Sequence, residues 1–529
     1  MITFADVAFR YHELAPPVFS AASFTIEEGE LCLIVGPTGS GKSTLLGCVN
    51  GLVPHFTGGI ASGSVTVGGR DISRARPSEL ADLVGYVPQD PLSSFVTDEV
   101  ELELAYTMEQ LALSDTTMRK RVTEIVDLLS LSELRTRALA TLSAGQRQRV
   151  AIGAALTAGP RILVLDEPTS ALDPGAAEEV LSALHRLVHD LGITVLLAEH
   201  RLERVVQYAD SALLLQNRTV THGPVADILA TSPVAPPVVR LGREQGWQPL
   251  PISIRSARRV AADVRAQLDH ATPPGDDVIH GDTALDAAGI TVDYPGVRAV
   301  NNLSFSARRG ERVAIMGRNG CGKSSLLWAL QGTGARSAGS LDVAGADPAT
   351  LKPPQRRTLA GLVPSEPGDL LYAETVEREC VNTDRAADVP AGTCRKILED
   401  LIEEVDVSVH PRDLSEGQRL ALALAVTLTA APPLLLLDEP TRGLDYPAKA
   451  ALARRLHDLA DAGHLLIVTT HDVEFVAEFA SRVAIMSDGE IVADGPAREV
   501  VAASPMFAPQ VAKILPGWLT VEEVREALR

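Results

Sequence analysis

The chain has 529 residues, a formal net charge of −20 and five cysteines. Its length exceeds what one hydrophobic core normally serves, so at least two domains are expected. The acidic balance argues against a protein whose main task is to bind nucleic acid, because that task needs a basic surface. The odd cysteine count, without Cys-x-x-Cys spacing, argues against a disulfide framework or a zinc site.

The chain begins with an alternating, strand-like segment, residues 1–7, which lacks the charged and apolar regions of a signal peptide. No apolar run in the sequence approaches the roughly 20 residues needed to span a bilayer. Any role at a membrane is therefore expected to be peripheral.

An apolar strand is predicted at residues 31–35, followed by a glycine-rich turn and a helix over residues 42–49. Further apolar strands are predicted at residues 162–165 and 193–197, as in parallel sheets covered on both faces. Strands that alternate with helices indicate an α/β fold with a parallel sheet. Between the glycine-rich turn and the signature, the helical periodicity of residues 98–111 and 118–129 predicts an inserted helical subdomain.

The second half repeats these elements in the same order, which predicts a second domain of the same fold. Its strands are predicted at residues 312–316, 434–437 and 465–468, and the helix after its glycine-rich turn at residues 323–330.

Each glycine-rich turn has the form Gly-x-x-x-x-Gly-Lys-Ser and follows a strand. Such a loop cradles phosphate oxygens with backbone N–H groups, the lysine reaches the β- and γ-phosphates, and the serine ligates Mg²⁺. The predicted nucleotide-binding residues are Gly36, Pro37, Thr38, Gly39, Ser40, Gly41, Lys42, Ser43 and Thr44, and Gly317, Arg318, Asn319, Gly320, Cys321, Gly322, Lys323, Ser324 and Ser325. Ser43 and Ser324 are the predicted magnesium ligands. Cys321 is interpreted as a small filler, with a redox role as the alternative.

Acidic pairs close two later strands, Asp166-Glu167 in the first half and Asp438-Glu439 in the second. The aspartates are predicted to hold the magnesium shell and the glutamates to activate the attacking water. A buried pair of this kind is costly without a cation or hydrogen-bond donors, which disfavours a purely structural role.

One histidine follows a buried strand in each half, His200 and His471. Both are expected at the carboxyl edge of the sheet, where open α/β sheets build their sites, and both are predicted to contact the γ-phosphate. Tyr11 and Tyr294 occupy equivalent early positions. Either could stack on an adenine ring, or pack on an edge strand of its own domain.

The segment between the halves resembles the end of the chain, since both contain a Gly-Trp pair, Gly246-Trp247 and Gly517-Trp518. Thr520-Val-Glu-Glu523 has the spacing of a capping box for a terminal helix. The predicted organisation is a first domain at 1–232, its C-terminal arm at 233–268, a linker at 269–283, a second domain at 284–504 and its arm at 505–529. The alternative is chance similarity between two tryptophan-bearing loops.

The ordered motifs resemble those of the ATP-binding-cassette (ABC) ATPases over nearly the whole chain. They include a glutamine loop at Gln89, the signatures Leu142-Ser143-Ala144-Gly145-Gln146 and Leu414-Ser415-Glu416-Gly417-Gln418, and the D-loops Ser170-Ala-Leu-Asp173 and Arg442-Gly-Leu-Asp445. The resemblance implies two P-loop domains, each with a RecA-like parallel core, an antiparallel β subdomain and an inserted helical subdomain. It also implies hydrolysis of ATP with Mg²⁺.

In this family the phosphate loop of each half faces the signature of the other half. The resemblance therefore adds Ser143, Gly145, Gln146, Ser415, Gly417 and Gln418 to the nucleotide sites, and Gln89 to the magnesium ligands. Both signatures depart from the usual double glycine, with Ala144 and Glu416 at the first position.

Three segments resemble the A components of energy-coupling-factor importers: Glu199-His-Arg-Leu-Glu203, Thr470-His-Asp-Val-Glu-Phe475, and Gln89-Asp-Pro-Leu-Ser-Ser-Phe-Val96. Such A components pair with a membrane T component and a substrate-binding S component to import vitamins or metal ions. This resemblance implies two fused A components, located peripherally on the cytoplasmic face of the cell membrane, with no nucleic-acid partner.

Two alternatives stay open, a fused sugar-importer ATPase and a two-cassette translation factor that acts on the ribosome. Such factors carry a long basic helical linker, whereas the arginines here are offset by acidic residues: Arg255, Arg258, Arg259 and Arg265 against Asp263, Asp269, Asp276 and Asp277. Zinc-bearing repair ATPases are excluded because the sequence lacks the cysteine pairs that they need.

The halves differ chemically at the glutamine loop. Val87-Pro-Gln89 in the first half aligns with Val363-Pro-Ser365 in the second. Serine is shorter and lacks the amide, so the second site is predicted to bind ATP but to turn it over more slowly.

Overall fold

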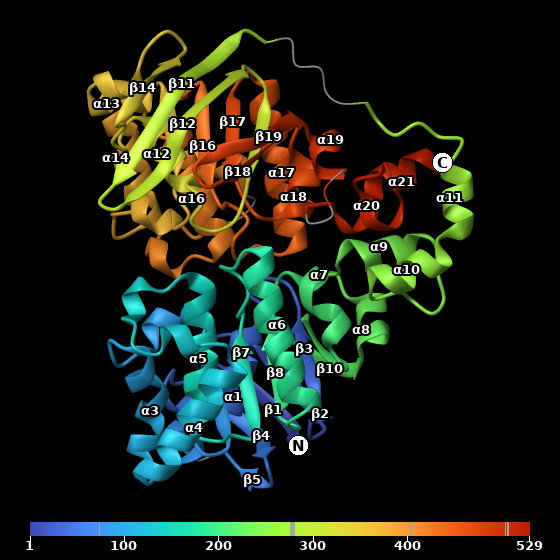
Figure 1. Ribbon diagram of the computed structural model, residues 1–529. Helices are drawn as coiled ribbons and strands as arrows, with labels where there is room; N and C mark the ends of the chain where they lie inside the picture. Colours follow the sequence, from blue (N-terminus) through green and yellow to red (C-terminus); the bar gives the residue numbers. More distant parts are fainter. Residues whose placement is uncertain (74, 276–280, 403–404, 503, 505–506) are drawn as a thin grey trace. The chain divides into compact units, whose positions relative to one another are not determined.

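The computed structural model describes residues 1–73, 75–275, 281–402, 405–502, 504 and 507–529. It divides into two compact units, Met1–Ala257 and Arg258–Arg529. Each unit contains an α/β core with an antiparallel sheet and a group of helices, as the sequence predicts (Figure 1).

The core of the first unit is a sheet of order β10-β9-β3-β8-β7-β6, parallel except for the edge strand β10, which runs antiparallel to β9. Its strands are β3 (Leu31–Val35), β6 (Val84–Val87), β7 (Ile162–Asp166), β8 (Thr194–Ala198), β9 (Ser211–Gln216) and β10 (Thr219–Pro224). Every residue of β3, β7 and β8 is buried. Their continuous apolar sequences follow from this burial on both faces.

A second sheet of the first unit, of order β2-β1-β4-β5, is antiparallel. Its strands are β1 (Ile2–Arg10), β2 (Phe19–Ile26), β4 (Ile60–Val67) and β5 (Arg70–Asp71). The side chains of Phe4, Phe9 and Phe19 are fully buried and form one core with residues of β3 and β7. The antiparallel subdomain is thus packed onto the parallel core.

The predicted helical subdomain of the first unit is confirmed. It consists of α3 (Val100–Gln110), α4 (Asp115–Leu128) and α5 (Ala144–Thr157), which contact one another (Figure 1). The other helices are α1 (Lys42–Val49), α2 (Leu52–His55), α6 (Pro174–His189), α7 (Leu202–Val205), α8 (Val225–Thr231) and α9 (Pro237–Glu244). The division between the units falls within α10 (Ile254–Val260).

The second unit repeats this plan, with an antiparallel sheet of order β12-β11-β14 and a core sheet of order β15-β16-β17-β13-β18-β19. The strands are β11 (Thr283–Tyr294), β12 (Val297–Arg308), β13 (Arg312–Met316), β14 (Ala338–Val343), β15 (Ala360–Val363), β16 (Leu434–Asp438), β17 (Leu465–Thr469), β18 (Arg482–Ser487) and β19 (Glu490–Pro496). Here too the last strand of the core sheet, β19, is antiparallel to its neighbour.

The helices of the second unit include α12 (Lys323–Gln331) after the glycine-rich turn and α17 (Tyr446–Asp461) beside β17. Its helical subdomain contains α14 (Val376–Ala387), α15 (Thr393–Leu401) and α16 (Glu416–Leu428). The remaining helices are α11 (Ala262–Leu268), α13 (Pro353–Arg357), α18 (Val473–Phe479), α19 (Ala497–Ala502), α20 (Gln510–Ile514) and α21 (Val521–Ala527).

The predicted capping box at Thr520 is only half correct. Thr520 caps α21, and its hydroxyl accepts a hydrogen bond from the N–H of Glu523. The second hydrogen bond of the box, from the N–H of Thr520 to the Glu523 carboxylate, is not formed. The carboxylate accepts the N–H of Leu519 at 2.7 Å and pairs with Arg498 at 2.6 Å, so an ion pair directs this side chain away from the box.

The domain, arm and linker boundaries stay predictions. Residues 276–280 of the predicted linker, with Asp276 and Asp277, and residues 505–506 of the second arm lie outside the described residues. Among the residues that are described, none of the helices is both long and apolar enough to cross a membrane.

Candidate functional site

The glycine-rich loop of the first unit curls around the lysine that ends it. The ammonium group of Lys42 donates hydrogen bonds to the carbonyl oxygens of Gly36 at 3.1 Å and Pro37 at 3.2 Å. Gly41 has a φ of +101°, and a Cβ there would lie 2.2 Å from a methyl carbon of Val18. A larger residue would therefore be strained and would clash, which explains the glycine at this position.

The second unit has the same loop geometry. The ammonium group of Lys323 donates to the carbonyl oxygens of Gly317 at 2.9 Å and Arg318 at 3.0 Å. Gly322 has a φ of +105°, and a Cβ there would lie 2.0 Å from the carbonyl oxygen of Ala299. Both loops lead into the first turn of a helix, α1 or α12, where the positive end of the helix dipole favours an anion.

The serine that follows each lysine hydrogen-bonds to the aspartate at the end of a core strand. Ser43 contacts Asp166 of β7, and Ser324 contacts Asp438 of β16. Burial raises the pKa of Asp166 and of Asp438, whereas the serine hydroxyls oppose that rise. A divalent cation would favour the ionised carboxylates, so each of these sites suits Mg²⁺, which prefers oxygen ligands.

These oxygen donors fit a cation whose remaining ligands come from phosphates and water. Across the described ranges, no group of three or more His, Cys, Asp or Glu side chains could hold a metal on its own. Ser40 adds a second sign of a ligand. Its hydroxyl is buried within the first loop and makes no hydrogen bond to the described residues, so it can donate to a bound phosphate.

The structure brings Glu167, His200 and Gln89 together in the first unit. The Nε2 of His200 lies 2.7 Å from one carboxylate oxygen of Glu167, and the Nε2 of Gln89 donates to the other at 3.1 Å. Glu167 is 8 % exposed and His200 is 7 % exposed, so the interaction is shielded from solvent. The three residues extend from the ends of β7, β8 and β6.

The second unit pairs the corresponding glutamate and histidine, but through the other imidazole nitrogen. The Nδ1 of His471 lies 2.8 Å from a carboxylate oxygen of Glu439. The hydroxyl of Thr469 donates to Asp438 at 2.5 Å, a bond for which the first unit has Ala198 at the matching position. The two sites thus share a plan but differ in detail.

Both glutamates adopt a backbone conformation that non-glycine residues rarely adopt. The φ of Glu167 is +48° and that of Glu439 is +49°. Such a conformation costs about 1–3 kcal/mol and persists where the surroundings over-determine it. The N–H of each glutamate donates to the neighbouring strand, to the carbonyl of Ala198 or Thr469 at 2.9 Å, which helps to hold this conformation. The same strain at equivalent positions supports a functional role for both side chains.

Each signature serine caps the helix of its own signature. Ser143 caps α5 and Ser415 caps α16, and each forms a reciprocal capping box with the glutamine three residues later, Gln146 or Gln418. Both serines are exposed, and Gly145 and Gly417 lie in the first turns of these helices. Glu416, the unusual acidic residue of the second signature, is paired with Arg419 at 3.1 Å.

Tyr11 lies near the phosphate loop of the first unit. Its hydroxyl hydrogen-bonds to that of Thr44 at 2.8 Å, its ring meets Phe9 edge to face, and it is 48 % exposed. Tyr294 is equally exposed. Stacking on an adenine ring and packing on the own domain thus both stay open for the two tyrosines.

Cys321 is buried inside the second loop, and a Cβ on Gly317 would lie 2.8 Å from its sulfur. Burial raises the pKa of the Cys321 thiol, which disfavours the reactive thiolate and agrees with the interpretation of Cys321 as a filler.

Sequence analysis missed two buried glutamates that shape the loop after each glutamine-loop position. Glu103 on α3 accepts the N–H groups of Val96 at 3.0 Å and Thr97 at 2.8 Å. Glu379 on α14 accepts the N–H groups of Tyr372 at 2.8 Å and Ala373 at 2.6 Å. Their recurrence in a Glu-x-Glu pattern in both halves is the signal that could have identified them.

The sequence matches a protein-family model described as ABC transporter twice, over residues 19–170 and 300–442. An ABC transporter ATP-binding protein of Streptomyces coelicolor is 54 % identical over 562 residues, which cover all of both chains. A protein of Methanosarcina mazei with the same description is 31 % identical and covers 100 % of this chain and 97 % of its own.

Among solved structures, a model of ribosome-bound archaeal Pelota and ABCE1 has a TM-score of 0.64 over 94 % of this chain and 79 % of the matched chain, at 21 % identity. This likeness concerns the fold alone. One family match lies within each unit, and it covers the phosphate loop and the acidic pair of that unit. The chain therefore belongs to the ABC transporter family of ATP-binding proteins, whose domains bind ATP with Mg²⁺ and hydrolyse it.

Proposed function

We propose that this chain is the energy-coupling subunit of a membrane importer of the energy-coupling-factor type, for a vitamin or a metal ion. It works on the cytoplasmic face of the membrane with an integral-membrane T component and a substrate-binding S component. By its family resemblance, each ATP lies between the phosphate loop of one cassette and the signature of the other. The observation that carries the proposal lies in the segment that follows the glutamine-loop position, Gln89 or Ser365. In each cassette this segment presents a surface that suits a helix of a partner: exposed apolar side chains in the first cassette and a cavity in the second.

The chemistry of the first site follows from its side chains. Lys42 and the loop N–H groups bind the phosphates. Ser43, Asp166 and Gln89 would hold Mg²⁺, which would offset negative charge on the phosphoryl oxygens. Glu167 accepts a proton from the attacking water, and its contacts with His200 and Gln89 hold its carboxylate in place for this role.

In the second site, Lys323, Ser324 and Asp438 take the binding roles of Lys42, Ser43 and Asp166. Glu439 and His471 take the roles of Glu167 and His200. ATP binding favours a closed arrangement of the cassettes and hydrolysis releases it, which moves the partner subunits.

In the first cassette, apolar side chains are exposed in the segment that follows Gln89. Leu92 in η2 (Pro91–Ser93) is 45 % exposed, Val96 is 60 % exposed, and Leu102 on α3 is 53 % exposed. The buried carboxylate of Glu103 fixes this loop through the N–H groups of Val96 and Thr97. Exposing several apolar side chains to water is unfavourable, and it is expected where a partner protein covers the surface.

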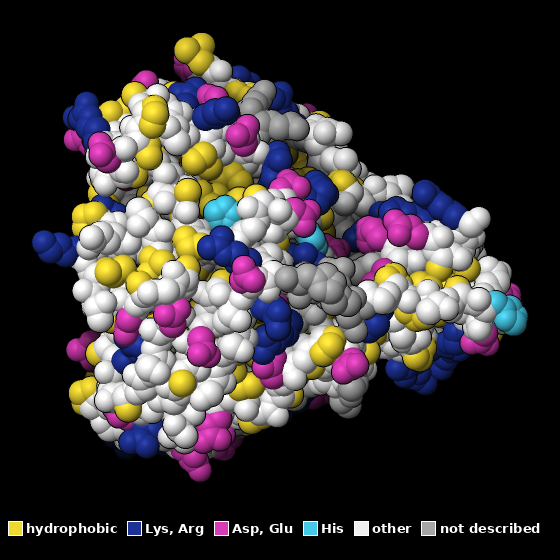
Figure 2. Space-filling model, turned by 90° about the horizontal axis from the view of Figure 1, so that it is seen from above, with side chains coloured by type: hydrophobic (Ala, Val, Ile, Leu, Met, Phe, Trp, Pro, Cys, Tyr) yellow, Lys and Arg dark blue, Asp and Glu magenta, His cyan; other side chains and the backbone are white. Residues whose placement is uncertain are grey.

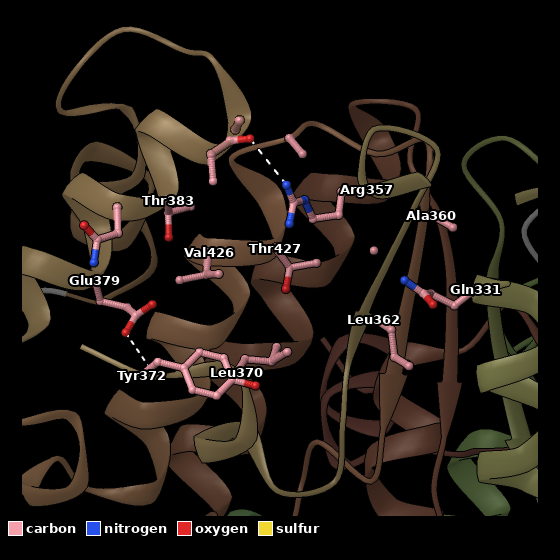
Figure 3. Close-up of a pocket in the computed structure, with 15 residues that line it drawn as sticks. Gln331, Arg357, Ala360, Leu362, Leu370, Tyr372, Glu379, Thr383, Val426 and Thr427 are labelled. Atoms are coloured by element: carbon pink, nitrogen blue, oxygen red, sulfur yellow. Dashed lines mark hydrogen bonds between the residues drawn. The ribbon is translucent and has the colours of Figure 1, made fainter. Parts of the chain in front are cut away.

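The second cassette has a cavity of about 360 Å³ at the equivalent place (Figure 3). Its lining includes residues of β15, α14, α16 and η7 (Pro367–Leu370), together with Tyr372, Gln331 of α12 and Arg357 of α13. Tyr372 is 85 % exposed at this cavity, and Glu379 holds its N–H (Figure 3). An apolar side chain of a helix in a membrane subunit would fit this cavity while the helix contacts Tyr372.

The charge of the molecule also favours a membrane-protein partner over RNA. Figure 2 shows one face, on which acidic and basic side chains are interspersed. Together with the net charge of −20, this distribution differs from the basic surface that contact with ribosomal RNA requires.

Cysteine cross-linking tests the partner. The five native cysteines are buried, so Ser94→Cys and Val96→Cys place one exposed thiol each on the first of these surfaces. Thr97 is a poor position because its hydroxyl donates to Glu103. With the full chain co-purified from membranes, we expect efficient cross-links to a small multispanning subunit.

The matched control is Thr116→Cys, an exposed position on α4 within the same helical subdomain. It is expected to give less than about one tenth of the cross-linked product, since residue 116 lies outside the surface after Gln89. Cross-links to ribosomal proteins from Ser94→Cys, or equal yields at all three positions, would contradict the proposal.

A further inference from the structure

The turn that follows Glu167 is held by two side chains that sequence analysis did not assign. The N–H of Thr169 donates to a carboxyl oxygen of Glu199 at 2.8 Å. The guanidinium of Arg204 donates to the carbonyl oxygens of Thr169 and Leu172, both at 3.2 Å. Glu199 and Arg204 thus bind opposite polar groups of one turn, the D-loop of the first cassette.

Glu199 is unusually placed for an acidic residue. It is 3 % exposed, and its second carboxyl oxygen is buried without a hydrogen bond among the described residues. Burial raises the pKa of Glu199, the hydrogen bond from Thr169 opposes the rise, and the nearby charge of Glu167 adds to it. Because burying a carboxyl group costs free energy, its retention at this position indicates a role.

The same strand end anchors both catalytic groups of this site. The N–H of Glu167 donates to the carbonyl of Ala198, the residue before Glu199, and His200 is the residue after it. Glu199 adds a further link between the two segments, because it accepts the N–H of Thr169, two residues after Glu167. Hydrogen bonds at residue 167 and at residue 169 therefore hold the chain on which Glu167 stands, while Glu167 itself lies 2.7 Å from His200.

The second cassette lacks this arrangement. Thr470 and Phe475 occupy the positions of Glu199 and Arg204. The hydroxyl of Thr470 lies 3.4 Å from that of Thr441 and accepts the N–H of Asp472, while Phe475 is buried and stacked on Phe479.

A buried ion pair stabilises this region of the second cassette instead. Lys449 of α17 pairs with Asp472 at 2.6 Å. This pair joins α17 to the start of α18. Because threonine and phenylalanine stand at the two equivalent positions, neither can supply the carboxyl group or the guanidinium that holds the turn in the first cassette.

We propose that Glu199 and Arg204 are positioning residues of the first ATP site, which fix the D-loop turn and thereby set Glu167 against His200. Their hydrogen bonds described above go to the backbone of the D-loop turn, so we expect them to act on turnover and not on nucleotide binding. Misplacing a catalytic group by a fraction of an ångström is enough to slow a reaction severalfold.

The test measures kcat, KM for ATP, affinity for a fluorescent ATP analogue and the unfolding midpoint for a set of variants of the full chain. Glu199→Ala is expected to lower kcat by roughly tenfold and Arg204→Ala by about fivefold, with KM and analogue affinity within about twofold. Glu199→Gln keeps the acceptor oxygen and the shape, so we expect it to retain at least about one third of the wild-type kcat.

Arg121→Ala is the matched control, because the Arg121 guanidinium also donates to two backbone carbonyls, those of Thr157 and Ala158 at 3.1 and 2.8 Å. These two residues precede the start of β7, whereas the site lies at the carboxyl end of that strand. This control should lower the unfolding midpoint as Arg204→Ala does, yet leave kcat within about twofold. If Glu199→Ala fails to fold, Glu199→Thr replaces it, since threonine is too short to reach Thr169.

Three results would overturn the proposal. They are an unchanged kcat in both the Glu199→Ala and Arg204→Ala variants, a loss in Arg121→Ala equal to that in Arg204→Ala, or a Glu199→Gln variant as slow as Glu199→Ala.

Discussion

Replacing Glu167 with glutamine is expected to lower ATP hydrolysis by at least about tenfold while ATP affinity stays within about twofold. Glutamine has the same shape but cannot accept a proton from water. The groups that bind phosphate, Lys42 and the N–H groups of the loop, are unchanged in this variant. A general base contributes about 10²- to 10⁴-fold to a rate, so the residual activity of this variant comes from the second site.

The double variant Glu167→Gln with Glu439→Gln supplies the control. It removes the base from both sites, and its rate should fall by the full factor of about 10²- to 10⁴-fold. Steady-state hydrolysis and binding of a fluorescent ATP analogue separate the two effects. A Glu167→Gln variant that hydrolyses ATP at the wild-type rate would show that Glu167 is not the base.

The elements around the phosphate loops could be predicted from sequence almost to the residue. The predicted strand at 31–35 and helix at 42–49 coincide with β3 and α1. The strand is buried on both faces and therefore reads as an unbroken apolar run, and Gly41, with its positive φ, marks where the helix begins. Both signals are local, so no tertiary information was needed.

Other features could not be predicted because their partners are backbone groups. Glu199 looks like an ordinary acidic residue in the sequence, yet it is buried, since it accepts an N–H group from a turn that no side-chain pattern identifies. Every buried N–H needs an acceptor, but the sequence does not show which residue supplies it.

The capping box at Thr520 failed for a related reason. The carboxylate of Glu523 is drawn to Arg498, a residue of another helix, and local spacing carries no information about such a competitor.

The asymmetry of the two sites depends on one side chain. Gln89 stands two residues past the end of β6, and its amide donates to Glu167 at 3.1 Å. Ser365 stands two residues past the end of β15 at the matching position. A serine hydroxyl is shorter by two carbons and cannot make the same bond without an intervening water.

The neighbouring acid does not replace the missing amide. Glu366 forms an ion pair with Arg442, a residue of the D-loop of its own cassette, so its carboxylate is committed there. In the first cassette the corresponding residue, Asp90, accepts the N–H of Leu92 and caps η2. The second site therefore keeps its lysine, its aspartate, its base and its histidine, but not the amide that orients the base.

We accordingly expect Glu439→Gln to lower total hydrolysis by less than about twofold, against at least about tenfold for Glu167→Gln. Restoring the amide gives the converse test. In the Glu167→Gln background, where only the second site turns over, Ser365→Gln should raise the rate severalfold, because an added amide can donate to Glu439 as Gln89 does to Glu167. Equal losses for the two glutamate variants, together with no gain from Ser365→Gln, would mean that the two sites fire as one unit and that the missing amide does not set their difference.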